Sequence, residues 1–145
     1  IFSAIFGSAG ERSDQKKSLA KAEEILDFLN LTMFKDEIAG NIPQEAQKRL
    51  SIGIALATEP KLLLLDEPTG GVNLQEDDSL IRIIQRIKKT GVTICLIEHK
   101  MKMVMDISDR VVVLSYGQKI AEGAPSAVSR DAKVIEAYLG PGYAA

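Results

Sequence analysis

The chain has 145 residues, which is enough for one globular domain with a buried core. Its hydrophobic content (46%) and charged content (26%) are ordinary for a globular protein, and a net charge of −2 without a dense Lys/Arg cluster gives no indication of a nucleic-acid partner. The single cysteine, Cys95, excludes a disulfide framework and a cysteine-rich metal site, and no apolar run approaches the roughly 18 residues of a membrane span.

The front of the chain is predicted to be helical. Residues 14–29 carry apolar side chains at helical spacing with charged residues opposite them. A shorter helix is expected over residues 33–39 and should end at Gly40-Asn41. A further helix is expected over residues 44–58, because its apolar side chains again recur at helical spacing.

The next segment, LLLLDEPTGGVN, covers residues 62–73. Its four leucines lie between Pro60 and Pro68 and are typical of a strand that is buried on both faces. A helix is expected over residues 76–89, with acidic residues near its start and lysines near its end, as the helix dipole favours. TICLI at residues 93–97 is predicted to be a second buried strand.

The last third of the chain is predicted to combine short helices with a hairpin. A helix over residues 100–107 should place its methionines in the core, and a third strand is expected over residues 110–115. A turn at residues 116–117 leads into KIAEG, the expected hairpin partner. A last helix ends at Gly140, and its Tyr138 is expected to have a structural role.

The alternation of strands and helices in the rear section predicts a parallel sheet, so the fold class is α/β with a helical part at the front. Open α/β sheets bind their ligands at the carboxyl ends of the strands, where Asp66 and Glu67 stand. An aspartate there can hold Mg²⁺ through water, and a glutamate beside it can polarise a water for attack on a phosphate. The alternative is a polar pair that merely ends a core strand.

His99, the only histidine, directly follows Glu98 after the second predicted strand. If the two strands are neighbours, His99 reaches the same edge of the sheet as Glu67. There it could donate a hydrogen bond to a terminal phosphate or hold the attacking water. The alternative is a histidine at a strand end that is bonded to a backbone carbonyl, and the motif by itself leaves both open.

Three motifs in order resemble those of the ATP-binding cassette (ABC) ATPases. LLLLDEP, the short loop GGVN and LIEHK some thirty residues later are similar to the family's Walker B strand, D-loop and switch-histidine strand. The stretch NIPQEAQKRLSIGIALATEPK looks like the family's signature segment and the helix that follows it. The resemblance covers almost the whole chain and is weakest over residues 1–30, and residues 98–139 look closest to the ATPase subunits of branched-chain amino acid importers.

The resemblance implies a partial P-loop NTPase fold of the ABC type. It implies a helical subdomain over residues 1–58 and the C-terminal part of the ATPase core over residues 59–145. It further implies the ATP-hydrolysing subunit of an importer for branched-chain or other hydrophobic amino acids. Such a subunit forms a homo- or heterodimer with a second ATPase subunit, binds membrane permease subunits at the cytoplasmic face of the cell membrane, and has no nucleic-acid partner.

The resemblance also implies roles for single residues, with ATP and Mg²⁺ as cofactors. Asp66 is similar to the Walker B aspartate that supports Mg²⁺, with water between them. Glu67 matches the catalytic base, and His99 matches the switch histidine that contacts the γ-phosphate. Gln47 matches the glutamine that closes the signature motif. Asn73 falls where the D-loop often has an Asp that contacts the partner across the dimer, so this residue departs from the usual pattern.

One residue departs from the signature pattern. Aligned on Gln47, Glu45 stands where a glycine is expected, and a glycine lets backbone N–H groups approach a phosphate closely. A glutamate adds bulk and a negative charge, and like charges ~4 Å apart repel by roughly 1 kcal/mol in water and about 4 kcal/mol near a protein surface. We therefore expect a weakened signature half-site, unless Glu45 turns toward solvent.

The phosphate loop G-x-x-x-x-G-K-[ST] occurs nowhere in this sequence, which begins with Ile instead of Met. We therefore expect the C-terminal portion of an ABC ATPase, with a pseudo-ATPase that is encoded short as the second explanation. An importer ATPase is the leading function. A non-hydrolysing interaction or regulatory module is the alternative, favoured by the missing loop and by Glu45. A third function is that of a soluble ABC ATPase of DNA repair or translation. The lack of basic clusters in the sequence counts against it.

Backbone amides of a phosphate loop supply much of the grip on a nucleotide. For the 145-residue chain alone we therefore expect no measurable ATP hydrolysis and at best weak Mg-ATP binding. A thermal titration with Mg-ATP checks this expectation, because the melting temperature should not rise at sub-millimolar nucleotide. A clear stabilisation in that range would contradict it.

Overall fold

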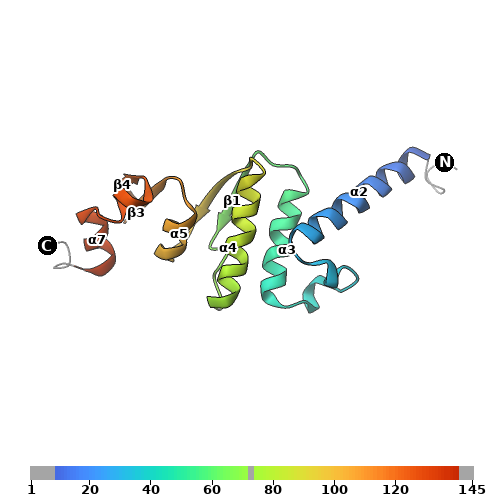
Figure 1. Ribbon diagram of the computed structural model, residues 1–145, viewed down its shortest axis with the longest axis horizontal. Helices are drawn as coiled ribbons and strands as arrows, with labels where there is room; N and C mark the ends of the chain where they lie inside the picture. The colour runs from blue at the N-terminus through green and yellow to red at the C-terminus, as the bar shows by residue number, and fades with distance from the viewer. Residues whose placement is uncertain (1–8, 72–73, 141–145) are drawn as a thin grey trace. The chain divides into compact units, whose positions relative to one another are not determined.

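The computed structural model describes residues 9–71 and 74–140. Contacts divide the chain into two compact units, residues 1–96 and residues 97–145. Figure 1 shows the helices and strands in chain order, and within the described ranges none of the helices has the length and apolarity that a bilayer span requires. The functional division between residues 58 and 59 stays a prediction.

The front half of the first unit is helical, as expected. Helix α2 (Ala9–Phe28) and helix α3 (Gln44–Leu56) lie against each other. The Arg49 guanidinium of α3 donates hydrogen bonds to the carbonyl groups of Leu29 (3.0 Å) and Asn30 (3.3 Å), just beyond the end of α2. These bonds connect α3 with the turn that follows α2.

The short helix predicted over residues 33–39 is wrong. Two 3-10 turns stand there instead, η1 (Thr32–Phe34) and η2 (Ala39–Asn41). Met33 and Ile38 are both exposed, and neither 3-10 turn contains a buried residue, so residues 33–39 do not present a buried apolar face. A helix of this length is marginal in water without such packing, which explains why only single turns form.

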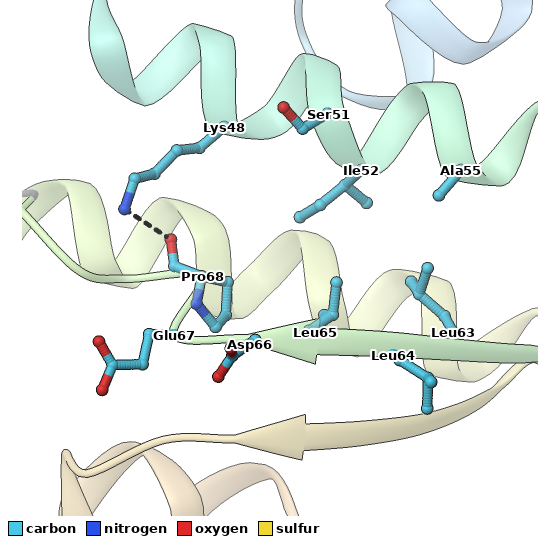
Figure 2. Close-up of a pocket in the computed structure, with 10 residues that line it drawn as sticks. All are labelled: Lys48, Ser51, Ile52, Ala55, Leu63, Leu64, Leu65, Asp66, Glu67 and Pro68. Atoms are coloured by element: carbon cyan, nitrogen blue, oxygen red, sulfur yellow. Dashed lines mark hydrogen bonds between the residues drawn. The ribbon is translucent and has the colours of Figure 1, made fainter.

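The rear half of the first unit contains a strand–helix–strand motif made of β1 (Leu62–Asp66), α4 (Leu74–Lys89) and β2 (Thr93–Ile97). The two strands are neighbours in one sheet and run parallel, as the arrows in Figure 2 show. The Thr93 N–H donates to the Lys61 carbonyl at 3.0 Å where the pair begins. The predicted parallel pair and the α/β fold class are therefore confirmed.

Strand β1 is buried on one face only, so the prediction of two buried faces is wrong. Leu63 and Leu65 are 4% and 9% exposed, whereas Leu62 and Leu64 are 53% and 69% exposed. Figure 2 shows Leu63 and Leu65 pointing toward α3 and Leu64 pointing away from it. In the part of the chain that the structure describes, the opposite face is left open to solvent. Strand β2 has no buried residue and its Cys95 is exposed, so the prediction of a second buried strand is wrong as well.

Helix α4 supplies much of the core of the first unit. Its apolar side chains recur at helical spacing and are almost completely buried, as predicted for Leu80, Ile83, Ile84 and Ile87. The Arg86 guanidinium lies 4.4 Å from the centre of the Phe28 ring, which is a cation–π contact between α4 and the end of α2. This packing holds the sheet and the helical front of the unit together.

The second unit contains, in chain order, α5 (Met101–Ile107), β3 (Val111–Ser115), β4 (Gln118–Gly123), α6 (Pro125–Val128) and α7 (Ala132–Leu139). Strands β3 and β4 pair antiparallel, beginning at Val111 and Gly123, so the predicted hairpin is confirmed. Tyr116 and Gly117 form its turn with φ values of 47° and 76°, the left-handed pair that a type I′ turn requires.

The second unit has a small core of its own. Its fully buried members come from the hairpin and the last two helices, and they are Val111, Val128 and Val134. Partly buried side chains of α5 and the hairpin pack against them, namely Met101, Val104, Met105, Val113, Ile120 and Ala121. The methionines of α5 therefore fill core space, as the sequence predicts.

Replacement of Gly53 tests the approach of α2 and α3. A Cβ atom at this position would lie 2.6 Å from Leu29 Cδ1 and 3.1 Å from Ile25 Cγ2, and the Leu29 side chain is fully buried. We expect Gly53→Ala to lower the free energy of unfolding by about 1–2 kcal/mol, because overpacking costs about 1–3 kcal/mol and the better helix propensity of alanine offsets up to about 1 kcal/mol.

Urea unfolding measures this change, and Gly40→Ala is the matched control. A Cβ atom at Gly40 would meet no atom within 4 Å. A Gly53→Ala variant that is as stable as Gly40→Ala would show that α2 and α3 are not in close contact at this position.

Candidate functional site

The acid pair stands at the carboxyl end of β1. Asp66 is the last residue of the strand, Glu67 follows it, and both are exposed. Glu67 has a φ of 42°, in the left-handed region that a non-glycine residue enters at a cost of about 1–3 kcal/mol. The Gly70 N–H donates to the Glu67 carbonyl at 3.0 Å and closes a tight turn. Figure 2 shows the Asp66 carboxylate pointing away from α3 and the Glu67 carboxylate extending past the end of the strand.

Lys48 of α3 holds this turn from the other side. Its ammonium group donates to the Pro68 carbonyl at 3.2 Å (Figure 2), and it also donates to the Gly70 carbonyl. Hydrogen bonds from a charged donor are stronger than those between neutral groups. Lys48 therefore ties the helix of the signature-like segment to the turn that begins at Glu67.

A pocket of about 290 Å³ lies between α3 and β1, and Figure 2 shows its lining residues. Ile52 and Ala55 of α3 face the leucines of the strand, and the polar groups of Lys48, Asp66 and Glu67 lie at one end. Ligand pockets commonly have volumes of about 300–1,000 Å³. The pocket is therefore a small recess beside the acid pair.

Gly70 lets the turn fold against Glu67. A Cβ atom at Gly70 would lie 3.3 Å from the Glu67 carbonyl oxygen and 3.8 Å from Glu67 Oε2, so a side chain there would crowd the glutamate. Thr69, between the two, is fully buried. Asp66 and Glu67 are therefore exposed, whereas Thr69 in the turn that follows them is buried.

The side chains of the signature-like segment bond within their own chain. Gln47 Nε2 donates to the Ile42 carbonyl at 2.9 Å, just before α3. Glu45 does not turn toward solvent, because its Oε2 accepts a hydrogen bond from Arg49 Nη2 at 2.6 Å and the two side chains are only 14% and 12% exposed. The charge of Glu45 is thus matched by a cation one helical turn away, which reduces the repulsion that the sequence predicts toward a phosphate.

His99 lies in the second unit, between the end of β2 and the start of α5. Its side chain is 64% exposed, while the side chain of Glu98 is buried. Glu98 Oε2 accepts hydrogen bonds from the backbone N–H groups of His99 (3.0 Å) and Lys100 (3.4 Å), and it lies 3.7 Å from His99 Nδ1. Glu98 therefore shapes the backbone around the histidine at the start of α5, where a negative charge is favourable.

Two parts of the predicted site stay predictions. Asn73, the expected D-loop contact, lies outside the described residues. Glu67 belongs to the first unit and His99 to the second, and each is described within its own unit. Their convergence around one phosphate group is therefore still an expectation from the sequence.

The acid pair has the donor chemistry that Mg²⁺ prefers. Among residues 9–71 and 74–140, no three His, Cys, Asp or Glu side chains gather into a metal site. Asp66 and Glu67 nevertheless offer two exposed neighbouring carboxylates. Mg²⁺ commonly binds one or two carboxylates and keeps several water molecules, so this donor set fits it.

Three residues that hold the site were not singled out by the sequence analysis for this role. Lys48 directly follows Gln47, and this position beside the signature-like segment is the signal that could have indicated it. Glu98 adjoins the histidine but gives no local sign of burial. Tyr138, expected to be structural, donates from its hydroxyl to the His99 carbonyl at 2.6 Å, and its separation of 39 residues hides this contact from any local pattern.

Two protein-family models match the chain. The model described as "ABC transporter" matches residues 4–70, which include the signature-like segment and the acid pair. The model described as "Branched-chain amino acid ATP-binding cassette transporter" matches residues 118–140, from the second strand of the hairpin to the end of α7.

Curated proteins of amino-acid transport are similar over nearly the whole chain. The high-affinity branched-chain amino acid transport ATP-binding protein BraF of Pseudomonas aeruginosa is 37% identical over 141 residues, which are 97% of this chain and 55% of the relative. The corresponding protein LivG of Escherichia coli is 36% identical with the same coverage. The chain thus spans about half the length of the curated relatives it matches.

The fold is similar to that of solved ATP-binding cassettes. The ADP conformation of MJ1267, an ATP-binding cassette of an ABC transporter, superposes with a TM-score of 0.78 at 35% sequence identity. The match covers 86% of this chain and 50% of that structure. The ABC-type α/β fold that the motifs imply is confirmed by this likeness.

Removal of the Lys48 ammonium tests whether α3 holds the turn. Lys48→Met keeps the hydrocarbon stem and loses both hydrogen bonds, so we expect residues 67–70 to become more mobile. The free energy of unfolding should fall by about 1.5–3 kcal/mol, the usual contribution of hydrogen bonds to a charged group.

NMR relaxation of the Thr69 and Gly70 amides measures the mobility, and urea unfolding measures the stability. Ser51→Ala is the control, because Ser51 lines the same pocket and its hydroxyl bonds only within α3, to the Gln47 carbonyl. If the turn is equally ordered in Lys48→Met and in the unsubstituted chain, the ammonium does not hold it.

Proposed function

Because the chain belongs to the ATP-binding cassette family, we propose that it acts in the ATP-binding subunit of a transporter related to the branched-chain amino acid importers. The observation that carries this proposal is the acid pair at the end of β1. Asp66 and Glu67 are exposed, and the turn that follows them is held by Lys48. The order of the motifs along the chain and the likeness to solved ATP-binding cassettes support it.

The proposed reaction is the attack of water on the γ-phosphate of ATP, which releases ADP and phosphate. Glu67 orients and polarises the attacking water, and its exposed carboxylate at the strand end leaves room for one. His99 donates a hydrogen bond to the γ-phosphate and stabilises the charge of the transition state. Two observations support this role. The imidazole of His99 is exposed, and its backbone is hydrogen-bonded to the side chains of Glu98 and Tyr138.

Asp66 is the proposed support for Mg²⁺, with water molecules between them. The ion, when bound, neutralises charge on the β- and γ-phosphates. The carboxylate of Asp66 is a hard oxygen donor at the end of a strand whose backbone is fixed by pairing with β2. Asp66 thus serves to bind and orient, while the proton of the attacking water passes to Glu67.

A second ATP-binding subunit is the proposed partner across the nucleotide. Gln47 closes the signature-like segment near the start of α3, and Asn73 is the proposed D-loop contact with the partner. The pairing of Glu45 with Arg49 supports a functional signature segment, because the acid is bound to its own helix. This partner is either a second copy of the same subunit or a related one.

Permease subunits in the membrane are the other proposed partners, at the inner face of the cell membrane. The names of the relatives support this, since BraF and LivG are ATP-binding proteins of branched-chain amino acid transport. On the same ground we propose a branched-chain or other hydrophobic amino acid as the transported compound. Other chains of the transporter select that compound.

A non-hydrolysing regulatory or interaction module is the second candidate function. It is favoured by Glu45, which stands at a position where a glycine is expected. The two candidates differ in one measurable property, because only the ATPase loses turnover when its general base is removed.

Glu67→Gln keeps the size of the side chain and removes the base. In the native transporter complex we expect the rate of ATP hydrolysis to fall about 10²–10⁴-fold, the usual contribution of general base catalysis, with ATP binding retained. Phosphate release and nucleotide binding, measured on the same preparation, separate the two effects.

Glu37→Gln serves as the matched control, because Glu37 is an exposed acid in the segment between η1 and η2. It should leave the rate unchanged. A Glu67→Gln complex that hydrolyses ATP as fast as this control would favour the regulatory module over the ATPase.

A further inference from the structure

The hydroxyl group of Tyr138 contacts the backbone of His99. It donates a hydrogen bond to the His99 carbonyl at 2.6 Å, across 39 residues of sequence. An O–H···O bond of this length is well formed. Both residues belong to the second unit, so the contact is a property of that unit alone.

The backbone of His99 is held by side chains on two sides. Its N–H donates to the buried Glu98 carboxylate at 3.0 Å, and its carbonyl accepts from Tyr138. The residue lies between the end of β2 and the start of α5, so no strand ladder fixes its conformation. The imidazole is 64% exposed and its Nδ1 lies 3.7 Å from the Glu98 carboxylate, so the two backbone bonds help to set where it can reach.

The hydroxyl of Tyr138 is itself placed by a packed helix. Helix α7 lies against β4, and Val134 anchors it with 2% exposure in the core of the second unit. Residues four apart share one face of a helix, so Tyr138 lies on the same face as Val134. The Asp131 carboxylate caps the start of the helix by accepting from the Lys133 N–H at 2.8 Å.

We propose that Tyr138 is a positioning residue for His99. Through Tyr138, the segment over residues 118–140, which includes α7, is connected to His99, the proposed contact of the γ-phosphate. This segment is the one that the branched-chain amino acid transporter model matches. The inference goes beyond the proposed function and rests on it for the role of His99. According to this inference, the end of α7 affects the rate of ATP hydrolysis as well as folding.

Tyr138→Phe removes the hydroxyl and keeps the ring, so it tests the hydrogen bond by itself. In the native transporter complex we expect kcat for ATP hydrolysis to fall roughly 3- to 10-fold, as the loss of one hydrogen bond to the positioning of a catalytic group predicts. The KM for ATP should stay the same, because His99 is proposed to act on the transition state. A merely structural role would instead lower the amount of folded protein and leave kcat per folded molecule unchanged.

Tyr116→Phe is the matched control. Tyr116 lies in the hairpin turn of the same unit and is fully exposed, so the loss of its hydroxyl should change neither kcat nor KM. Thermal unfolding of both variants shows whether either substitution affects folding.

An NMR measurement on the 145-residue chain tests the contact independently of hydrolysis. The carbonyl ¹³C resonance of His99 reports on the hydrogen bond that this group accepts. It should move in Tyr138→Phe and stay in place in Tyr116→Phe. An unchanged resonance in Tyr138→Phe overturns the inference.

His99→Ala separates failure of the inference from failure of the proposed function. If His99→Ala abolishes hydrolysis and Tyr138→Phe has the control's kcat, the positioning role is wrong and the ATPase proposal stands. If His99→Ala hydrolyses ATP normally, the proposed role of the histidine is wrong, and the positioning role is overturned with it. A fall in kcat for Tyr138→Phe, together with the shifted resonance, supports the inference.

Discussion

The hydrogen bonds from the Lys48 ammonium group to the carbonyls of Pro68 and Gly70 connect the helical part of the first unit with the end of its sheet. The chain must turn sharply after β1, and it does so with Glu67 in a left-handed conformation that costs about 1–3 kcal/mol. A strained residue persists where surrounding bonds determine its backbone, and here a turn bond and a charged donor do so. The direction of the acid pair therefore depends on where α3 lies.

Helix α3 is in turn placed by its contacts with α2. Arg49 bonds to the carbonyl groups that follow α2 and to Glu45, and Gly53 allows the close approach of Leu29. The same helix begins with the signature-like segment, where Gln47 bonds to the Ile42 carbonyl. Helix α3 therefore contacts both this segment and the turn at Glu67.

In the second unit, too, a loop with an exposed side chain is held by hydrogen bonds, but from different groups. His99, whose imidazole is exposed, has its backbone held by the buried carboxylate of Glu98 and by the phenol of Tyr138 from the last helix. The helix can do this because the valine core of the unit fixes α7 against the hairpin. In both units a side chain distant in sequence donates a hydrogen bond to a backbone carbonyl of a loop. Lys48 does so at the turn that follows the exposed Glu67, and Tyr138 does so at the exposed His99.

The sequence by itself determined most elements and the identity of the candidate residues, because periodicity, turn residues and short motifs are local. It placed β1, α4 and β2, the hairpin at Tyr116 and the acid pair at the end of a strand. It failed at residues 33–39, where the apolar side chains of the two 3-10 turns are not buried and a longer helix lacks stabilisation. Only the tertiary structure decided which face of β1 is covered, that Glu45 pairs with Arg49, and that Lys48 and Tyr138 hold the functional loops. The hydrogen bonds made by Lys48 and Tyr138 join residues that are 20 to 39 positions apart in the sequence. Whether such residues meet depends on how whole helices pack, and no local sequence pattern encodes this.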